Sequence, residues 1–210
     1  MGLTAALIVL AKAPRAGHSK TRLCPPCTPR QAAALARAAL ADTLDAVLAT
    51  PAARHVLVLD GPAGGWLPAG LEVIPQRGDG LDERLAHAFA DIGGPGVLVG
   101  MDTPQVNAHD LGGALARLTS SDTDAVLGPA PDGGYWAIGL RAPDPRAFLG
   151  VPMSTAHTGH AQHARLRMLG LRVTLLPALR DVYRIADARA VAKLAPAGRF
   201  ARALAVTGVA

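Results

Sequence analysis

Basic and small side chains gather in one segment near the N-terminus, directly after an apolar run. The segment contains Lys12, Arg15, Gly17, Lys20, Thr21 and Arg22. Lysine offers an anion a point charge and arginine a two-pronged donor, while glycine and small residues let backbone amides approach it. The glycine spacing differs from that of a P-loop. A solvated loop whose charges bind nothing is the alternative, but the concentration of cations favours a polyphosphate site.

Two aspartates are candidates for holding a divalent metal. Asp102 lies in the string Gly100–Pro104, directly after a buried-type apolar run, and Asp181 closes the last strand-like segment. Carboxylate oxygens are hard ligands that suit Mg²⁺ or Mn²⁺ already bound to phosphate oxygens. Asp102 could instead cap the next helix or shape a turn. Its occurrence together with the basic loop favours the metal, because both would neutralise the same phosphates.

The most unusual local string is an Asp-Gly-Gly turn followed at once by two aromatic residues. It consists of Asp132, Gly133, Gly134, Tyr135 and Trp136. The two glycines predict a tight turn with positive φ. A hairpin whose aromatic side chains pack into the core is one interpretation. The other, which we adopt as the functional hypothesis, is a substrate-pocket wall with Asp132 available to a hydroxyl or amine.

Two further patterns are interpreted as structural. Cys24-Pro25-Pro26-Cys27 has redox spacing, but both middle residues are proline, and a zinc site would need two more ligands. We therefore predict a plain loop. His157, His160 and His163 follow one another at intervals of three and are predicted to form a solvated stripe, since no carboxylate or cysteine partner is nearby.

The composition narrows the class of protein. The chain has 210 residues, is 50% hydrophobic and carries a net charge of +5. This length and hydrophobic content suit a single α/β domain over residues 1–210 that needs no disulfide or structural metal. Only 3% of the residues are aromatic, which leaves little for stacking on bases, so we do not expect nucleic acid as a partner. No apolar run approaches the roughly 18 residues of a membrane span, and no signal peptide is recognisable, so a cytoplasmic location is expected.

Strand-like and helix-like segments alternate along the chain. Strands are predicted over residues 3–11, 54–60, 71–74, 97–99, 124–128, 135–140 and 171–176, and helices over 29–47, 81–92, 108–119, 154–169, 187–194 and 197–205. This alternation predicts an α/β fold with a mostly parallel central sheet and helices on both faces. Ligands of such sheets bind beyond the carboxyl ends of the strands. That edge would hold the basic loop, Asp102 and the turn at residues 129–134.

These three motifs occur in the same order as in the DUF2064 family, also called rSAM/selenodomain-associated transferase 1, which the chain therefore resembles. The similarity runs from residue 5 to about residue 194. This family belongs to the GT-A-like nucleotide-diphospho-sugar transferase superfamily. More distantly, the chain resembles the 2-phospho-lactate guanylyltransferases, which share a basic loop ending in Lys-Thr-Arg-Leu. The resemblance implies a Rossmann-like GT-A sheet, nucleotide phosphates over the first loop and a divalent metal at Asp102.

The chain departs from the family pattern at two positions. Asp181-Val182-Tyr183 stands where the family usually carries Asp-Val-Asp, and Asp82 stands where relatives tend to carry glycine. If the lost acid ligates metal in relatives, this chain would bind metal more weakly, differently or not at all. Both changes leave room for a specialised or inactive member.

We expect a Mg²⁺-dependent nucleotidyltransferase that joins a nucleoside triphosphate to a small acceptor and releases pyrophosphate. Lys20, Arg22, Asp102 and Asp132 are the expected catalytic residues. The number of cations favours a triphosphate over the diphosphate of a nucleotide-sugar. A GT-A glycosyltransferase that uses a nucleotide-sugar, with Asp132 as general base, and a nucleotide-binding module without catalysis remain as alternatives. The base, the acceptor and the oligomeric state stay open.

Overall fold

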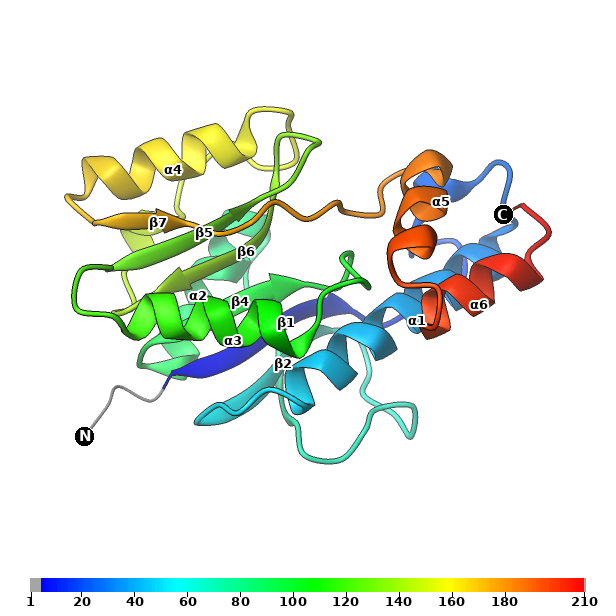
Figure 1. Ribbon diagram of the computed structural model, residues 1–210, viewed down its shortest axis with the longest axis horizontal. Helices are drawn as coiled ribbons and strands as arrows, with labels where there is room; N and C mark the ends of the chain where they lie inside the picture. The colour runs from blue at the N-terminus through cyan, green and yellow to red at the C-terminus, as the bar shows by residue number, and fades with distance from the viewer. Residues whose placement is uncertain (1–4, 210) are drawn as a thin grey trace.

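A seven-stranded mixed sheet forms the centre of the molecule (Figure 1). The computed structural model describes residues 5–209, so the first two residues of the predicted strand at 3–11 lie outside the described part. The strands are β1 (Ala6–Lys12), β2 (Arg54–Asp60), β3 (Glu72–Pro75), β4 (Gly96–Gly100), β5 (Ala125–Pro129), β6 (Tyr135–Leu140) and β7 (Val173–Leu175). The helices are α1 (Pro29–Leu48), α2 (Leu81–Ile92), α3 (Ala108–Thr119), α4 (Thr158–Met168), α5 (Ile185–Leu194) and α6 (Arg199–Val206), with short 3-10 turns η1 (Thr21–Leu23) and η2 (Pro145–Ala147).

The sheet order is β3-β2-β1-β4-β6-β5-β7, and β6 alone among the described strands runs antiparallel to its neighbours. The prediction of an α/β fold with a mostly parallel sheet is thus confirmed. The antiparallel strand follows from chain length. Only a short turn joins β5 to β6, and a parallel pair would need a crossover of a dozen or more residues.

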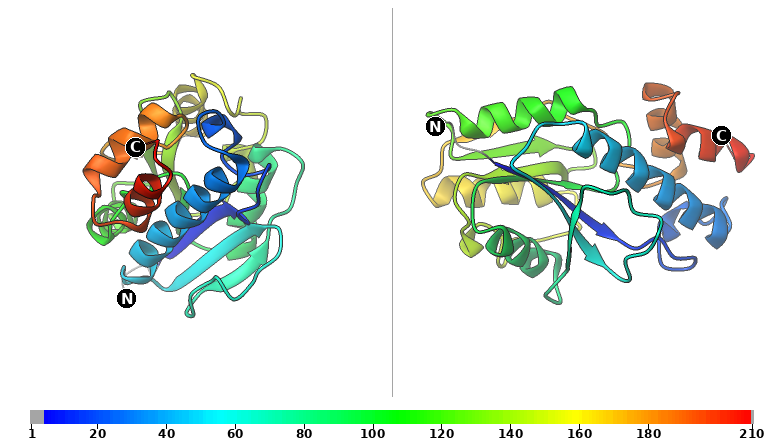
Figure 2. Two further views of the ribbon diagram at one scale, coloured as in Figure 1. Left: turned by 90° about the vertical axis from the view of Figure 1, so that its right-hand side faces the viewer. Right: turned by 90° about the horizontal axis from the view of Figure 1, so that it is seen from below.

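Helices cover both faces of the sheet because side chains alternate along each strand (Figure 2). Leu7 and Val9 of β1 pack into a core with α1 and α3. Ile8, between them, packs into a second core with α2 and α4 on the opposite face. The carboxyl ends of β1 and β4 therefore lie between two packed layers.

A third, smaller core anchors the loop that follows β1. Leu23 and Cys27 pack against the first half of α1 and against α5 and α6. A capping box is present at the start of α1: Gln31 N–H donates to Thr28 Oγ1 (3.2 Å) and Thr28 N–H donates to Gln31 Oε1 (2.8 Å). Such a cap contributes about 1 kcal/mol. The far end of the basic loop is thus held by a well-defined helix start.

The helix predicted over residues 154–169 begins later than expected, at Thr158. Ser154 has φ +59°, and residues 154–157 form a loop in which Thr155 Oγ1 accepts a hydrogen bond from His157 N–H. The prediction that the helix begins at residue 154 is therefore wrong. His157 precedes the helix, so the histidine stripe is reduced on α4 to His160 and His163.

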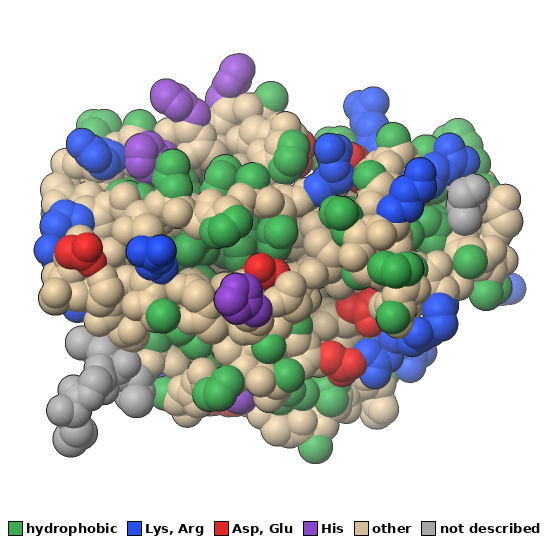
Figure 3. All heavy atoms as spheres, viewed as in Figure 1, with side chains coloured by type: hydrophobic (Ala, Val, Ile, Leu, Met, Phe, Trp, Pro, Cys, Tyr) green, Lys and Arg blue, Asp and Glu red, His purple; other side chains and the backbone are tan. Residues whose placement is uncertain are grey.

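Most of the positive charge is ordinary surface. On the face shown in Figure 3, Lys and Arg side chains are interspersed with apolar and acidic ones rather than forming one patch. Many arginines pair with acids: Arg54 with Glu72, Arg77 with Asp91, Arg84 with Asp60, Arg146 with Asp144, Arg172 with Asp124, Arg180 with Asp187, and Arg199 with Asp42 and Asp45. Within residues 5–209, no helix is long and apolar enough to cross a membrane.

Candidate active site

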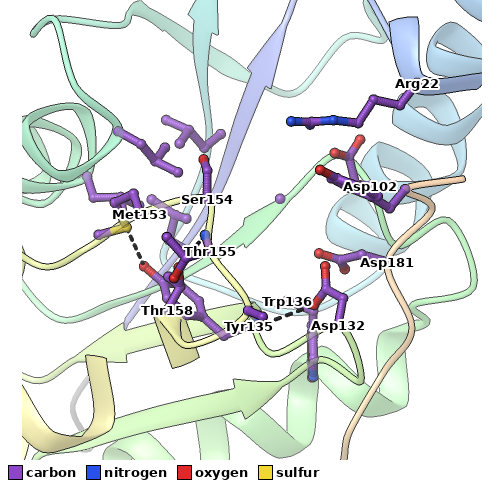
Figure 4. A pocket seen from close by; sticks show the side chains of 18 residues that line it. Arg22, Asp102, Asp132, Tyr135, Trp136, Met153, Ser154, Thr155, Thr158 and Asp181 are labelled. Carbon is purple, nitrogen blue, oxygen red and sulfur yellow. Dashed lines mark hydrogen bonds between the residues drawn. The ribbon is translucent and has the colours of Figure 1, made fainter. Parts of the chain in front are cut away.

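Two adjacent cavities lie beyond the carboxyl ends of β1 and β4, at the edge of the sheet where the sequence predicts ligand binding. Their volumes are about 510 Å³ and about 420 Å³. Both are lined by Arg22, Asp102, Ser154 and Tyr183, which thus form a shared wall. The larger cavity extends towards Asp132 and residues 153–158 at the start of α4 (Figure 4), and the smaller one extends towards the basic loop.

The basic loop is a compact turn. Ser19 Oγ accepts the Arg15 N–H (2.9 Å), while the amides of His18 and Ser19 donate to the Arg15 carbonyl. Gly17 has φ +79°, in the region that favours glycine. Lys20 also adopts a left-handed conformation, with φ 51°, immediately before η1.

Lys20 joins the basic loop to the candidate metal-binding aspartate. Its Nζ lies 2.7 Å from Asp102 Oδ1 and donates to the Val182 carbonyl. The Lys20 side chain is only 7% exposed and that of Asp102 is 47% exposed. Burying an ammonium is costly unless it is paired, so these two acceptors hold Lys20 in place.

Three carboxylates face one another in the larger cavity (Figure 4). Burial, and then the charges of Asp102 and Asp132, raise the pKa of Asp181 from 3.8 to about 7. Thr103 Oγ1 contacts Asp181 Oδ1 at 3.5 Å. Asp181 is therefore protonated for part of the time near neutral pH and does not add a full negative charge to those of Asp102 and Asp132.

These carboxylates fit a metal that is held partly by the substrate. Among the described residues no three His, Cys, Asp or Glu side chains form a ready-made metal cage. Mg²⁺ commonly takes one or two carboxylates and completes its shell with phosphate oxygens and water. Asp102, half exposed, with Asp181 beside it, meets that requirement.

The Asp-Gly-Gly turn packs tightly against the 154–159 segment. Asp132 Oδ1 accepts the Gly134 N–H (2.9 Å), and Gly159 N–H donates to the Gly133 carbonyl (2.8 Å). The predicted positive φ is confirmed at Gly133, where φ is +89°. A Cβ there would lie 1.9 Å from the Ala156 carbonyl oxygen, so this position requires glycine.

The two aromatic residues after the turn differ in their surroundings. The Trp136 side chain packs in the core, 2% exposed, and its indole N–H donates to the Pro177 carbonyl (2.9 Å). Trp136 thus backs the wall of the larger cavity from the core, and the core interpretation describes its ring better than a substrate-contacting one. Tyr135 borders the same cavity, but its hydroxyl contacts Gln162 Oε1 (3.3 Å), and burial raises its pKa.

The structure brings most of the predicted site residues together. Lys12, Thr21 and Arg22 line the smaller cavity with Lys20 and Asp102. Asp132, Gly134, Tyr135 and Asp181 line the larger one, and Gly133 supports it from the turn. The exposed Arg15 and Gly17 lie outside both cavities, where they shape the loop.

Sequence reasoning missed one apolar side of the larger cavity. It is formed by Leu10, Leu81, Leu85, Leu98 and Met153. Leu81 and Leu85 lie one helical turn apart on α2, and Leu10 is near the end of β1. The spacing of these residues can be read from the sequence, but apolar residues at such positions usually pack in the core and do not line a cavity. Ser154 also lines this cavity, which the sequence did not indicate because it predicts a helix that begins at this residue.

The cysteine loop and Asp82 have structural roles. Cys24 and Cys27 are free thiols, and burial raises the pKa of Cys27, which disfavours a reactive thiolate. This agrees with the predicted plain loop. Asp82 Oδ2 accepts the Gly150 N–H (3.0 Å), which lowers the pKa of Asp82 and ties α2 to the loop before α4.

Comparison with known proteins identifies similar chains. The sequence model of DUF2064, described as an uncharacterized protein conserved in bacteria, matches residues 34–155. A phosphoenolpyruvate guanylyltransferase of Salinispora arenicola is 34% identical over 182 residues, which cover 80% of each chain. The matched family region includes Asp102 and the Asp-Gly-Gly turn but not the basic loop or Asp181.

Solved structures share the fold. A proposed nucleotide-diphospho-sugar transferase from Desulfovibrio desulfuricans G20 superimposes with a TM-score of 0.77 at 29% identity, covering 88% of this chain and 85% of that one. The 2-C-methyl-D-erythritol 4-phosphate cytidylyltransferase of Thermus thermophilus superimposes with a TM-score of 0.56 at 16% identity, covering 92% and 99%. The second likeness concerns the fold alone.

Proposed function

This chain belongs to the DUF2064 family of bacterial proteins, and on that premise we propose that it transfers a nucleotidyl group from a nucleoside triphosphate to a small acceptor. It is a transferase, in keeping with the activities named for its relatives. The observation that carries the proposal is the 2.7 Å contact between Lys20 Nζ and Asp102 Oδ1. It brings a cation suited to polyphosphate and a carboxylate suited to a metal to the wall between two cavities.

The smaller cavity suits the triphosphate. Lys12, Lys20 and Arg22 supply its cations, and Thr21 a hydroxyl. The larger cavity offers an apolar side for the nucleoside and, near Asp132, a polar end for the acceptor. The guanylyl activity named for the Salinispora relative makes GTP the first donor to test.

The residues then divide the chemistry among them. The acceptor oxygen attacks the α-phosphorus, the bond from that phosphorus to the oxygen bridging to the β-phosphate breaks, and pyrophosphate leaves. Lys20 and Arg22 stabilise the charge that develops on the pyrophosphate. The exposed Asp132 takes the proton of an acceptor hydroxyl. Asp102, with Asp181, holds the Mg²⁺ or Mn²⁺, which when bound withdraws charge from the phosphate oxygens.

A thermal-shift screen with Mg²⁺ tests the donor class. Nucleoside triphosphates raise the melting temperature by mass action if they bind the native state. The Lys20→Ala/Arg22→Ala double variant loses that shift. Unchanged stabilisation of the double variant by GTP would remove the basic loop from the site.

Transfer of a sugar from a nucleotide-sugar is the second candidate. It is favoured by the description of the Desulfovibrio structure as a proposed nucleotide-diphospho-sugar transferase. In that reaction Asp132 acts as general base on the acceptor hydroxyl. If nucleotide-sugars stabilised the protein and nucleoside triphosphates did not, the reaction would be sugar transfer. Binding of either donor without turnover over a broad acceptor set would indicate a binding module.

A further inference from the structure

The side chain of Tyr183 lies against the guanidinium of Arg22 in the wall between the two cavities. Arg22 Cζ is 4.3 Å from the centre of the Tyr183 ring, within the range of a cation–π interaction. Both residues line both cavities. Tyr183 stands at a position where the family pattern carries an acid, so this contact involves a residue that departs from that pattern.

The backbone around Tyr183 is fixed on both sides of the ring. Val182 N–H donates to the Asp102 carbonyl (2.8 Å), and the Val182 carbonyl accepts the Lys20 ammonium. After Tyr183, the Arg184 N–H is held by Asp187 at the start of α5 (2.9 Å). The tyrosine ring is therefore a positioned platform, although it is 38% exposed.

Arg22 lies in the shared wall, and its charge is not neutralised by a neighbouring carboxylate of the described residues. Lys20 is already paired with Asp102. Within residues 5–209, by contrast, no carboxylate lies within ion-pair distance of Arg22. An aromatic face attracts the guanidinium plane and leaves its N–H edges free for an anion.

Arg22 lies in the same wall as Asp102 but is not paired with it. Arg22 and Asp102 extend from the same wall, with the guanidinium drawn beside the carboxylate in Figure 4. A long, flexible arginine without its platform could turn onto Asp102, because a bidentate arginine–carboxylate pair is a strong interaction. In that pair Arg22 would no longer be free to bind phosphate, and the half-exposed Asp102 would be covered.

We propose that Tyr183 is a positioning residue that holds Arg22 by its ring face, so that the guanidinium edges bind a phosphate group at the wall between the cavities. The proposal rests on the proposed function in one respect: the smaller cavity must accept phosphate. Tyr183 acts in this proposal through Arg22. Its role is carried by the ring, and the hydroxyl is not required.

Binding of inorganic tripolyphosphate, measured by titration calorimetry on the full chain, isolates this role from the base and the acceptor. Tyr183→Leu removes the ring and weakens binding about three- to tenfold, the range expected of an exposed to partly desolvated cation–π contact. Tyr183→Phe keeps the ring and retains binding. Since Tyr183 is partly exposed at the surface, all variants should unfold at similar temperatures.

A double-mutant cycle shows whether the effect passes through Arg22. Arg22→Ala weakens binding, and adding Tyr183→Leu to it causes no further loss, because the two residues act as one unit. Arg184→Ala is the matched control. The guanidinium carbon of Arg184 lies farther from the centre of the same ring, at 5.9 Å, and the residue lines neither cavity, so binding changes less than about twofold.

Each of the following results would overturn the inference. Equal binding by the wild type and Tyr183→Leu would show that the ring does not position Arg22. Additive losses in the double variant, or a loss in Arg184→Ala as large as in Tyr183→Leu, would show a general charge or folding effect. If the wild type binds GTP but not tripolyphosphate, only the inference fails, whereas failure to bind either removes the proposed triphosphate site as well.

Discussion

Lys20 and Asp102, 82 positions apart in the chain, meet through a 2.7 Å contact between Nζ and Oδ1 that joins the basic loop to the end of β4. The same ammonium donates to the Val182 carbonyl, so one buried lysine connects three segments. Together with the hydrogen bond from Val182 N–H to the Asp102 carbonyl (2.8 Å), this side chain holds the cavity wall together.

Replacing Lys20 with methionine should lower the melting temperature. Methionine fills a similar space but leaves Asp102 and the Val182 carbonyl without their donor, at a cost of about 1–3 kcal/mol, or roughly 2–12 °C for a chain of this size. Calorimetry checks this. Lys12→Met, at an exposed lysine of the same cavity, should shift the melting temperature by no more than about 2 °C. Equal shifts in both variants would contradict the account of Lys20.

Asp181→Asn should stabilise the protein most above neutral pH. The native pKa of Asp181 is about 7 against an ordinary 3.8, so between these values the native state binds more protons than the unfolded state. Stability therefore falls as pH rises from about 4 to about 7, and asparagine removes this loss. The melting temperature of the variant should exceed that of the wild type by an amount that grows to a few degrees as the pH rises from about 4 to about 8. A constant difference across that range would contradict a raised pKa.

Gly133→Ala should be much more damaging than Gly17→Ala. Both glycines have positive φ, +89° and +79°, so both substitutions incur backbone strain of about 1–3 kcal/mol. Only at Gly133 does the added Cβ meet backbone, 1.9 Å from the Ala156 carbonyl oxygen, whereas nothing lies within 4 Å at Gly17. Denaturant unfolding of the two variants measures the difference. Equal losses would mean that the turn can move away from the 154–159 segment.

Trp136→Phe should reduce stability and leave donor affinity nearly unchanged. The ring lies in the core, and its loss leaves the Pro177 carbonyl unpartnered, which costs about 1–3 kcal/mol. Unfolding in urea and donor affinity, measured on the same samples, separate the two effects. If the variant were as stable as the wild type but bound the donor more weakly, the Trp136 indole would be a substrate-contacting group and not a core residue.

Local signals were enough to predict the elements. The helix predicted over residues 29–47 matches α1 to within one residue, and those predicted over 81–92 and 108–119 match α2 and α3. The rule that ligands bind at strand ends located the basic loop and Asp102. These features depend on residues close together in sequence.

Other features depend on contacts that spacing does not encode. The side of the sheet on which Trp136 packs follows from β6 inserting antiparallel between β4 and β5. The late start of α4 follows from the 154–157 loop closing over Gly133. The platform that Tyr183 offers Arg22 joins residues 161 positions apart, and the sequence showed Tyr183 only as a departure from the family pattern.

Transfer of label from GTP carrying radioactive phosphorus at the α-position, measured with Mg²⁺ and a panel of small acceptors that includes phosphoenolpyruvate, tests the central claim most directly. Nucleotidyl transfer predicts that the label moves to the acceptor while unlabelled pyrophosphate is released in equal amount. Lys20→Met should slow both by about 10²-fold or more. Label retained on GTP under conditions in which a nucleotide-sugar donates its sugar to an acceptor would contradict the claim.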